Sequence, residues 1–313
     1  MTDDRELPGD DADTDATSVE EQPVAAQPPT EIAGRFEAMI AAVPATQPAF
    51  SSRRTGVAAL PINGPLITLT LLMTVIFLMF LLIEPTPRWI ALFGGVVAAL
   101  SLDGILRSQR REPFENGADA TPYLFLPALF AIAIPVFAEH NVRDFWAAPV
   151  AIAAGIAFGA VAVAEVASVR EFDPARNVGR FIAAGATYFV AFALYALTYR
   201  FGLGLQESIA AVAFVSALLA IELLHEGEVD PLETLLFAAV TAIAVAEVRW
   251  ALHFLPLDGY LAGLALLLSF YFVTGLLHSH LVRQLSITMA TEYAIVTAAG
   301  IALVIWARAA GLA

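Results

Sequence analysis

Three ionisable residues near one end of a long apolar segment, residues 231–252, are the first candidates for chemistry. They are Glu247, Arg249 and His253. A charge inside a membrane segment is costly, so it often marks a site for a substrate or an ion. Residues two apart on a helix point to different faces, so Glu247 could pair with His253, or with Arg143 from a neighbouring turn, but not simply with Arg249. We treat the three as candidate binding residues, with a structural pair at the helix end as the alternative.

The neighbours of Glu247 predict how this segment faces the rest of the protein. Ala244 and Ala246 are small, and small residues let membrane helices approach closely. We therefore predict that Glu247 faces the interior of a helix bundle. Arg249 should then extend outward to the membrane interface, as long basic side chains do near helix ends.

A second group of acids lies near the opposite ends of three other apolar segments. Asp103, Glu165 and Glu222 are each a few residues from a segment end, where a carboxylate could reach headgroups or water. Local ion pairs with Arg107 and Arg170 explain the first two. The functional alternative is a ring of acids at the inner mouth of a path for cations or protons.

Three histidines lie at the same ends as these acids. Together with carboxylates, His225, His278 and His280 could bind zinc or iron. His278 and His280 are two residues apart, however, so a continuous helix would point them to different sides. The sequence has no His-Glu-x-x-His pattern, no Walker loop, no dinucleotide fingerprint and no cysteine. We therefore assign no catalytic residue, no metal and no cofactor.

The elements that carry these residues are membrane-spanning helices. Hydrophobic residues make up 59% of the 313 residues and charged residues only 15%, whereas a soluble domain is about half apolar and a quarter charged. Residues 61–313 are predicted to form an all-α, polytopic membrane domain of about nine transmembrane helices. The expected apolar segments are 66–83, 88–106, 122–138, 146–168, 180–200, 206–224, 231–252, 259–280 and 290–310.

The first 60 residues differ in character. They hold eleven acids and four arginines, and their first half has almost no large apolar side chains, so it cannot bury enough surface to fold. We predict an acidic, disordered cytoplasmic tail, with a possible amphipathic helix at residues 31–43. The net charge of −14 and the absence of lysine give no support for nucleic-acid binding. The expected partners are the lipid bilayer and possibly other membrane subunits.

Two features predict the orientation. With the N-terminus in the cytoplasm of a cell whose plasma (inner) membrane holds the protein, the inner side has nine arginines and the outer side five. The inner arginines are Arg53, Arg54, Arg107, Arg110, Arg111, Arg170, Arg176, Arg180 and Arg283. The four tryptophans, Trp89, Trp146, Trp250 and Trp306, all fall at outer segment ends. The C-terminus is therefore expected outside.

A weak internal repeat indicates how the segments are organised. Glu165, Glu171 and Asp173-Pro174 recur 57 residues later as Glu222, Glu228 and Asp230-Pro231. The unit would be a helical hairpin, so the fold reads as one helix plus four tandem hairpins; Asp-Pro is also ordinary helix capping. With its tandem hairpins, acidic tail and tryptophan-marked face, the region 61–313 resembles uncharacterised bacterial multi-pass membrane proteins classed as domains of unknown function.

These features favour a non-enzymatic accessory or assembly subunit of a membrane complex. The alternatives are a small transporter or ion-coupled permease, and an intramembrane enzyme acting on lipid substrates through Glu247, Arg249 and His253. A water-filled cavity at mid-depth would favour transport. A lipid-sized cleft beside Glu247 would favour the enzyme. Closely packed helices with an exposed flank would favour the accessory role.

The orientation leads to a first prediction. Topology reporters fused after Arg111 and after Ala313 should report opposite compartments, because an odd number of spans separates the termini and Arg111 lies on the N-terminal side. The enzymatic activity of each fusion, measured in intact cells, checks this. Two fusions that report the same compartment would show that the number of spans is wrong.

Overall fold

The computed structural model describes residues 63–84, 88–109, 121–142, 144–169, 176–225, 231–283 and 285–311. The predicted disordered tail and the possible amphipathic helix at 31–43 lie outside these residues. Within the described ranges, nine α-helices are each long and apolar enough to cross a membrane, as the sequence predicted. They are α2 (Gly64–Leu82), α3 (Trp89–Gln109), α4 (Pro122–Asn141), α5 (Ala147–Ser168), α6 (Arg176–Arg200), α7 (Leu205–Leu224), α8 (Pro231–Leu252), α9 (Gly259–Leu281) and α10 (Ile287–Ala309).

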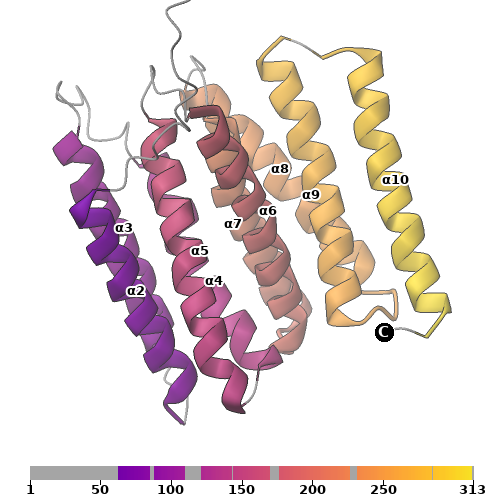
Figure 1. Ribbon diagram of the computed structural model, residues 1–313. Helices are drawn as coiled ribbons and strands as arrows, with labels where there is room; N and C mark the ends of the chain where they lie inside the picture. The colour runs from indigo at the N-terminus through magenta and orange to yellow at the C-terminus, as the bar shows by residue number, and fades with distance from the viewer. Residues whose placement is uncertain are drawn as a thin grey trace, which may run out of the picture. The chain divides into compact units, whose positions relative to one another are not determined.

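Successive helices run in opposite directions (Figure 1). The pairs α3–α4, α5–α6, α7–α8 and α9–α10 each pack side by side, which confirms the arrangement of one helix followed by four hairpins. Long-range contacts then join the hairpins, because α2 packs on α5, and α6 packs on α9. Helix α4 touches α2, α3, α5, α6 and α7, so it lies at the centre of these contacts.

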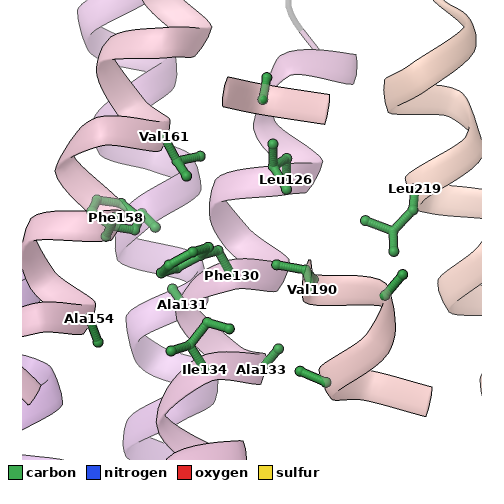
Figure 2. Packing of buried hydrophobic residues seen from close by; sticks show 14 of the residues in the cluster. Leu126, Phe130, Ala131, Ala133, Ile134, Ala154, Phe158, Val161, Val190 and Leu219 are labelled. Carbon is green, nitrogen blue, oxygen red and sulfur yellow. The ribbon is translucent and has the colours of Figure 1, made fainter. Parts of the chain in front are cut away.

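The core around α4 is made of aromatic and aliphatic side chains from several helices (Figure 2). The ring of Phe130 on α4 meets the ring of Phe158 on α5 edge to face, with centroids 6.1 Å apart. Phe77 on α2 meets Phe158 from another side at 6.3 Å. All three side chains are buried. Offset and edge-to-face contacts of this kind add to the energy of burial.

Glycines set the closest helix approach, between α2 and α5. Gly155 and Gly159 are four residues apart on α5, and they lie against Thr74 and Thr70 of α2. A Cβ atom at Gly159 would lie 2.7 Å from the Cγ2 atom of Thr70, and one at Gly155 would overlap the Thr74 side chain. Both threonine hydroxyls donate to carbonyl oxygens of their own helix, at 2.8 Å, which leaves their polar groups satisfied in the interface.

Polar side chains inside the bundle are also satisfied locally or across helices. The hydroxyls of Tyr195 on α6 and Ser216 on α7 are 2.7 Å apart, and both residues are fully buried. This bond joins two helices far from their ends. Hydrogen bonds between membrane helices contribute about 0.6 kcal/mol on average. The bond therefore stabilises the register of α6 against α7 modestly.

Helix α10 differs from the other eight described helices. It packs against α9, and Val304 is its one buried residue. The contact uses small residues again: Gly300 lies against Leu268, and Gly275 of α9 lies against the ring of Tyr293. Only 6% of its most apolar window is buried inside the protein, compared with 33–61% for the other spans. The opposite face of α10 thus makes no contact with the described residues.

The glycine contacts give a second prediction. Replacing Gly159 with Ala should destabilise the protein by about 1–3 kcal/mol, because overpacking forces α2 and α5 apart. Thermal unfolding in detergent measures this as a fall of several degrees. Gly104→Ala and Gly185→Ala are matched controls, since no atom lies within 4 Å of a Cβ at either position. Equal melting temperatures for all three variants would show that the α2–α5 contact does not hold the helices together.

Candidate functional site

The four tryptophans gather at one end of the helices. At this end α3, α5, α7 and α9 begin, and α2, α4, α6, α8 and α10 end; we call it the tryptophan end (Figure 1). Trp89, Trp146, Trp250 and Trp306 are all exposed there, so the predicted one-sided belt is present in the fold. Indole rings at this position suit the level of lipid headgroups. The other end we call the turn end.

The structure reverses the prediction for Glu247 and Arg249. Glu247 is exposed, whereas Arg249 is buried, with 4% of its surface exposed. The physical reason is the helix face. Arg249 continues the buried stripe of Ala238, Ala242 and Val245, which are small or medium in size.

Glu247 instead continues a stripe of large apolar residues. Leu236, Val240 and Ile243 are all exposed, on the side of α8 that faces away from the bundle. Ala246 directly precedes Glu247 and Ala244 lies three residues before it. Both are half-buried, between the exposed and the buried stripes of α8, so their size did not give the direction of Glu247. The spacing of small against large residues along α8 is the signal that would have placed both side chains correctly.

His253 is not brought together with the other two candidates. It follows the end of α8, is exposed, and its ring meets that of Phe254, with centroids 5.5 Å apart. Glu247 and Arg249 point to different sides of α8. The three candidates therefore do not form one site. Arg249 is the buried one of the three.

The guanidinium of Arg249 rests on an aromatic ring. Its Cζ atom lies 4.2 Å from the ring centroid of Tyr199 on α6. The Nε and Nη1 atoms of Arg249 and the hydroxyl of Tyr199 are all buried without a hydrogen-bond partner among the described residues. Gly259, at the start of α9, lies beside Tyr199, where a Cβ would be 3.2 Å from the tyrosine Cβ. Three polar groups without partners are thus concentrated at one point.

The burial of the Arg249 charge costs more free energy than its contact with the Tyr199 ring returns. An ion taken out of water costs several kcal/mol even after relaxation, and a desolvated contact between a cation and an aromatic ring returns about 2 kcal/mol. Arg249 forms no ion pair with a described residue. The nearby acids Glu207 and Asp258 accept from backbone N–H groups of Gly204 and Tyr260 instead. The charge of Arg249 therefore lacks a protein counter-ion in the part that the structure describes.

Two more arginines at the tryptophan end also lie on aromatic rings. Arg200 lies 4.7 Å from the centroid of Tyr260, and its Nη2 atom donates to the Tyr260 hydroxyl at 2.7 Å. That hydroxyl donates in turn to the Oδ1 atom of Asn141. Arg88 lies 5.3 Å from the centroid of Phe201. Arg88 and Arg200 are exposed, so water can solvate them, unlike Arg249.

The sequence reasoning also missed Glu139 of α4. One of its carboxylate oxygens, Oε2, is buried without a hydrogen-bond partner among the described residues. Glu139 lies two residues before the end of α4, close to Asn141. Its position near a helix end resembled that of many solvated acids, so spacing alone gave no signal of its burial.

The acids of the turn end divide into two kinds. Asp103 pairs with Arg107 one turn later, with Nε and Oδ2 2.8 Å apart, which confirms the predicted ion pair. Glu165 and Glu222 are 1% and 5% exposed, so the expectation that they reach headgroups or water was wrong. They lie on the inward faces of α5 and α7. The suggested partner of Glu165, Arg170, lies outside the described residues.

The histidines of the turn end are held separately. The Nδ1 atom of His225 lies 2.7 Å from the backbone oxygen of Glu222, and its ring meets Tyr123 edge to face. Helix α9 continues through His278 and His280 to Leu281, so the two rings point to different sides. Among the described residues, no three His, Asp or Glu side chains gather in a group that could hold a metal ion.

Comparison with known proteins assigns the membrane-spanning region to a family. A family model described as "Protein of unknown function (DUF5656)" matches residues 65–307. The chain belongs to this family. The DUF5656 region includes all or nearly all of each of the nine described helices, and it contains Arg249, Tyr199 and the three turn-end acids. No curated protein and no solved structure matches the chain significantly.

The reversed burial of Glu247 and Arg249 gives a third prediction. Arg249→Ala should lower the melting temperature by several degrees, because it removes the ring contact, worth about 2 kcal/mol when desolvated, and leaves a space beside Tyr199. Glu247→Ala should change the stability by less than about 0.5 kcal/mol, as at most exposed positions. Arg308→Ala, at an exposed arginine of the same end, is the matched control. A larger loss for Glu247→Ala than for Arg249→Ala would contradict the observed burial.

Proposed function

We propose that this DUF5656 protein is a non-enzymatic accessory subunit of a membrane complex, and that α10 docks onto a membrane-spanning helix of another subunit. The observation that carries the proposal is the exposure of α10. Of its 23 residues, Val304 alone is buried, and its protein contact is with α9. A helix held so loosely contributes little to the core, and its free face is available to a partner.

The composition of that free face supports helix docking. The side turned away from α9 carries Thr291, Ile295, Ala298 and Ala302, all exposed. Small residues at this spacing allow close approach of two helices in a membrane. Threonine also lies in the tight contact between α2 and α5 within this chain, where it faces glycine. The free face thus resembles that contact in its small residues, with alanine in place of glycine.

A partner of a different sequence fits this face better than a second copy. Two copies related by an axis along the membrane normal would place identical residues at the same depth. Glu292 follows Thr291 and is exposed at the edge of this face, so two carboxylates would lie at the same level beside such an interface. Like charges at one level repel each other. A different subunit can instead present a neutral or basic group there.

Two apolar cavities between the helices do not favour transport or lipid chemistry. A cavity of 370 Å³ between α2, α5 and α6 is lined almost entirely by apolar side chains such as Leu66, Val163 and Ile182. A cavity of 310 Å³ between α3, α4, α6 and α7 is similarly apolar apart from Arg88 and Thr198. A transport path needs polar groups that replace the water around its substrate. Neither cavity includes Glu247, Arg249 or His253.

For the location we propose the plasma membrane, with the N-terminus in the cytoplasm and the C-terminus outside. The support is the excess of arginine in the sequence at the turn end and the exposed tryptophans at the other end. In this orientation α10 ends on the outer side of the membrane, and Arg249 lies near the outer interface.

Site-specific photocrosslinking in native membranes tests the proposed function as a fourth prediction. A benzophenone amino acid at Ile295 or Ala298 should give one heavier adduct, the same from both positions, because both lie on the free face of α10. Leu100 on α3 is the matched control, since it is 69% exposed but lies on another helix. The adduct should contain a membrane-spanning protein identified by mass spectrometry.

Two outcomes would contradict the proposal. An adduct of twice the mass of the chain would show a dimer of this protein instead of an accessory contact. Equal adducts from Leu100 and Ala298, or none from either α10 position, would show that the face meets lipid and not a partner.

A further inference from the structure

Arg249 is a buried charge without an ion-pair partner among the described residues. It lies on α8, whereas α10 packs against α9. It is 4% exposed, and its Nε and Nη1 atoms are buried without partners. Buried arginines in proteins are almost always paired. The ring of Tyr199, 4.2 Å from Cζ, holds the guanidinium by one face. A planar group stacked by its face keeps its N–H donors, which lie in the plane, directed elsewhere.

The groups around Arg249 are donors without an acceptor. The Tyr199 hydroxyl is also buried and has no hydrogen-bond partner among the described residues. Asp258 caps the start of α9, Glu247 is exposed on another side of α8, and the buried Oε2 atom of Glu139 makes no hydrogen bond to Arg249. No described residue accepts a hydrogen bond from Nε or Nη1 of Arg249, or pairs with the hydroxyl of Tyr199.

The position on α8 defines the backbone around Arg249. Arg249 lies in the last turn of α8, which packs against α7 and α9. Helices α7 and α9 begin at this end, and α6 and α8 end there. Helix N-termini carry partial positive charge and C-termini partial negative charge. The backbone thus contributes both signs, and the full positive charge at this point is the Arg249 side chain.

We propose that Arg249 and Tyr199 form a binding site for a phosphate oxyanion. Guanidinium N–H groups donate charge-assisted hydrogen bonds to phosphate oxygens, and the unpartnered Nε and Nη1 atoms of Arg249 are two such donors. A phosphate can come from an anionic lipid, because the exposed tryptophans mark the headgroup level at this end, or from free phosphate in solution. The bound oxygens complete the hydrogen bonds of Arg249 and neutralise its charge.

The test measures the melting temperature of the purified, delipidated full-length protein in a neutral detergent. One arm adds phosphatidylglycerol, with diacylglycerol of the same acyl chains as the phosphate-free control. The other arm adds inorganic phosphate, with sodium chloride at equal ionic strength as its control. A ligand that binds the folded state raises the melting temperature with increasing concentration. We expect such a rise in the lipid arm, the phosphate arm or both.

The variants assign the rise to the site. Arg249→Met keeps most of the side-chain volume and should weaken the apparent binding at least tenfold, whereas Arg308→Met, at an exposed arginine of the same end, should leave it unchanged. Tyr199→Phe keeps the ring and should weaken binding by a smaller factor, and it serves as the deciding variant if Arg249→Met does not fold.

The results separate the two sources of phosphate. A rise with phosphatidylglycerol alone identifies a lipid headgroup, and a rise with inorganic phosphate as well identifies a site open to free phosphate. The absence of a rise in both arms would overturn the proposal, and so would an equal rise in wild type, Arg249→Met and Tyr199→Phe. Crosslinking at α10 is independent of these outcomes, so failure here leaves the proposed docking face untouched.

Discussion

Close approach at small residues is the constraint on which the rest of this structure depends. Helices in hydrocarbon gain little by hiding apolar surface from one another, because lipid chains are equally apolar. Gly155 and Gly159 bring α5 against Thr70 and Thr74 of α2, and Gly263 of α9 lies against the backbone of Ala196 on α6. These contacts join the hairpins into one bundle. Large apolar residues are consequently left to face lipid, as Leu71 and Leu100 do.

The same rule explains both candidate surfaces. On α8 the small residues turn inward, and they carry Arg249 with them into a buried position where the ring of Tyr199 is its described partner. On α10, Gly300 lies against Leu268 of α9, and the ring of Tyr293 lies against Gly275 of α9. A further face of α10, with alanine and threonine, remains exposed. Small residues on the other helices form contacts within the bundle, whereas this set on α10 makes no contact with the described residues.

Much of this fold could be predicted from the sequence, because span length and apolarity are strong signals. The nine helices, the hairpin order, the tryptophan belt and the Asp103–Arg107 pair all follow from spacing along single segments. The site could be predicted only in part. The spacing of small and large residues along α8 places Arg249 on the buried face and Glu247 on the exposed face, although Ala244 and Ala246 taken alone suggested the reverse. Whether Glu165 reaches water depends on the helices that cover it, and that contact leaves no pattern within one segment.

Helices α2–α9 form the folded bundle, and α10 is attached to it as a contact helix. Thermal unfolding of a chain that ends after Arg283, compared with the full-length protein in the same detergent, tests this division. We expect a cooperative transition within a few degrees of the full-length value, because α10 buries only Val304. A truncated chain that fails to insert, or that has lost its transition, would show that α10 is part of the fold and contradict this division.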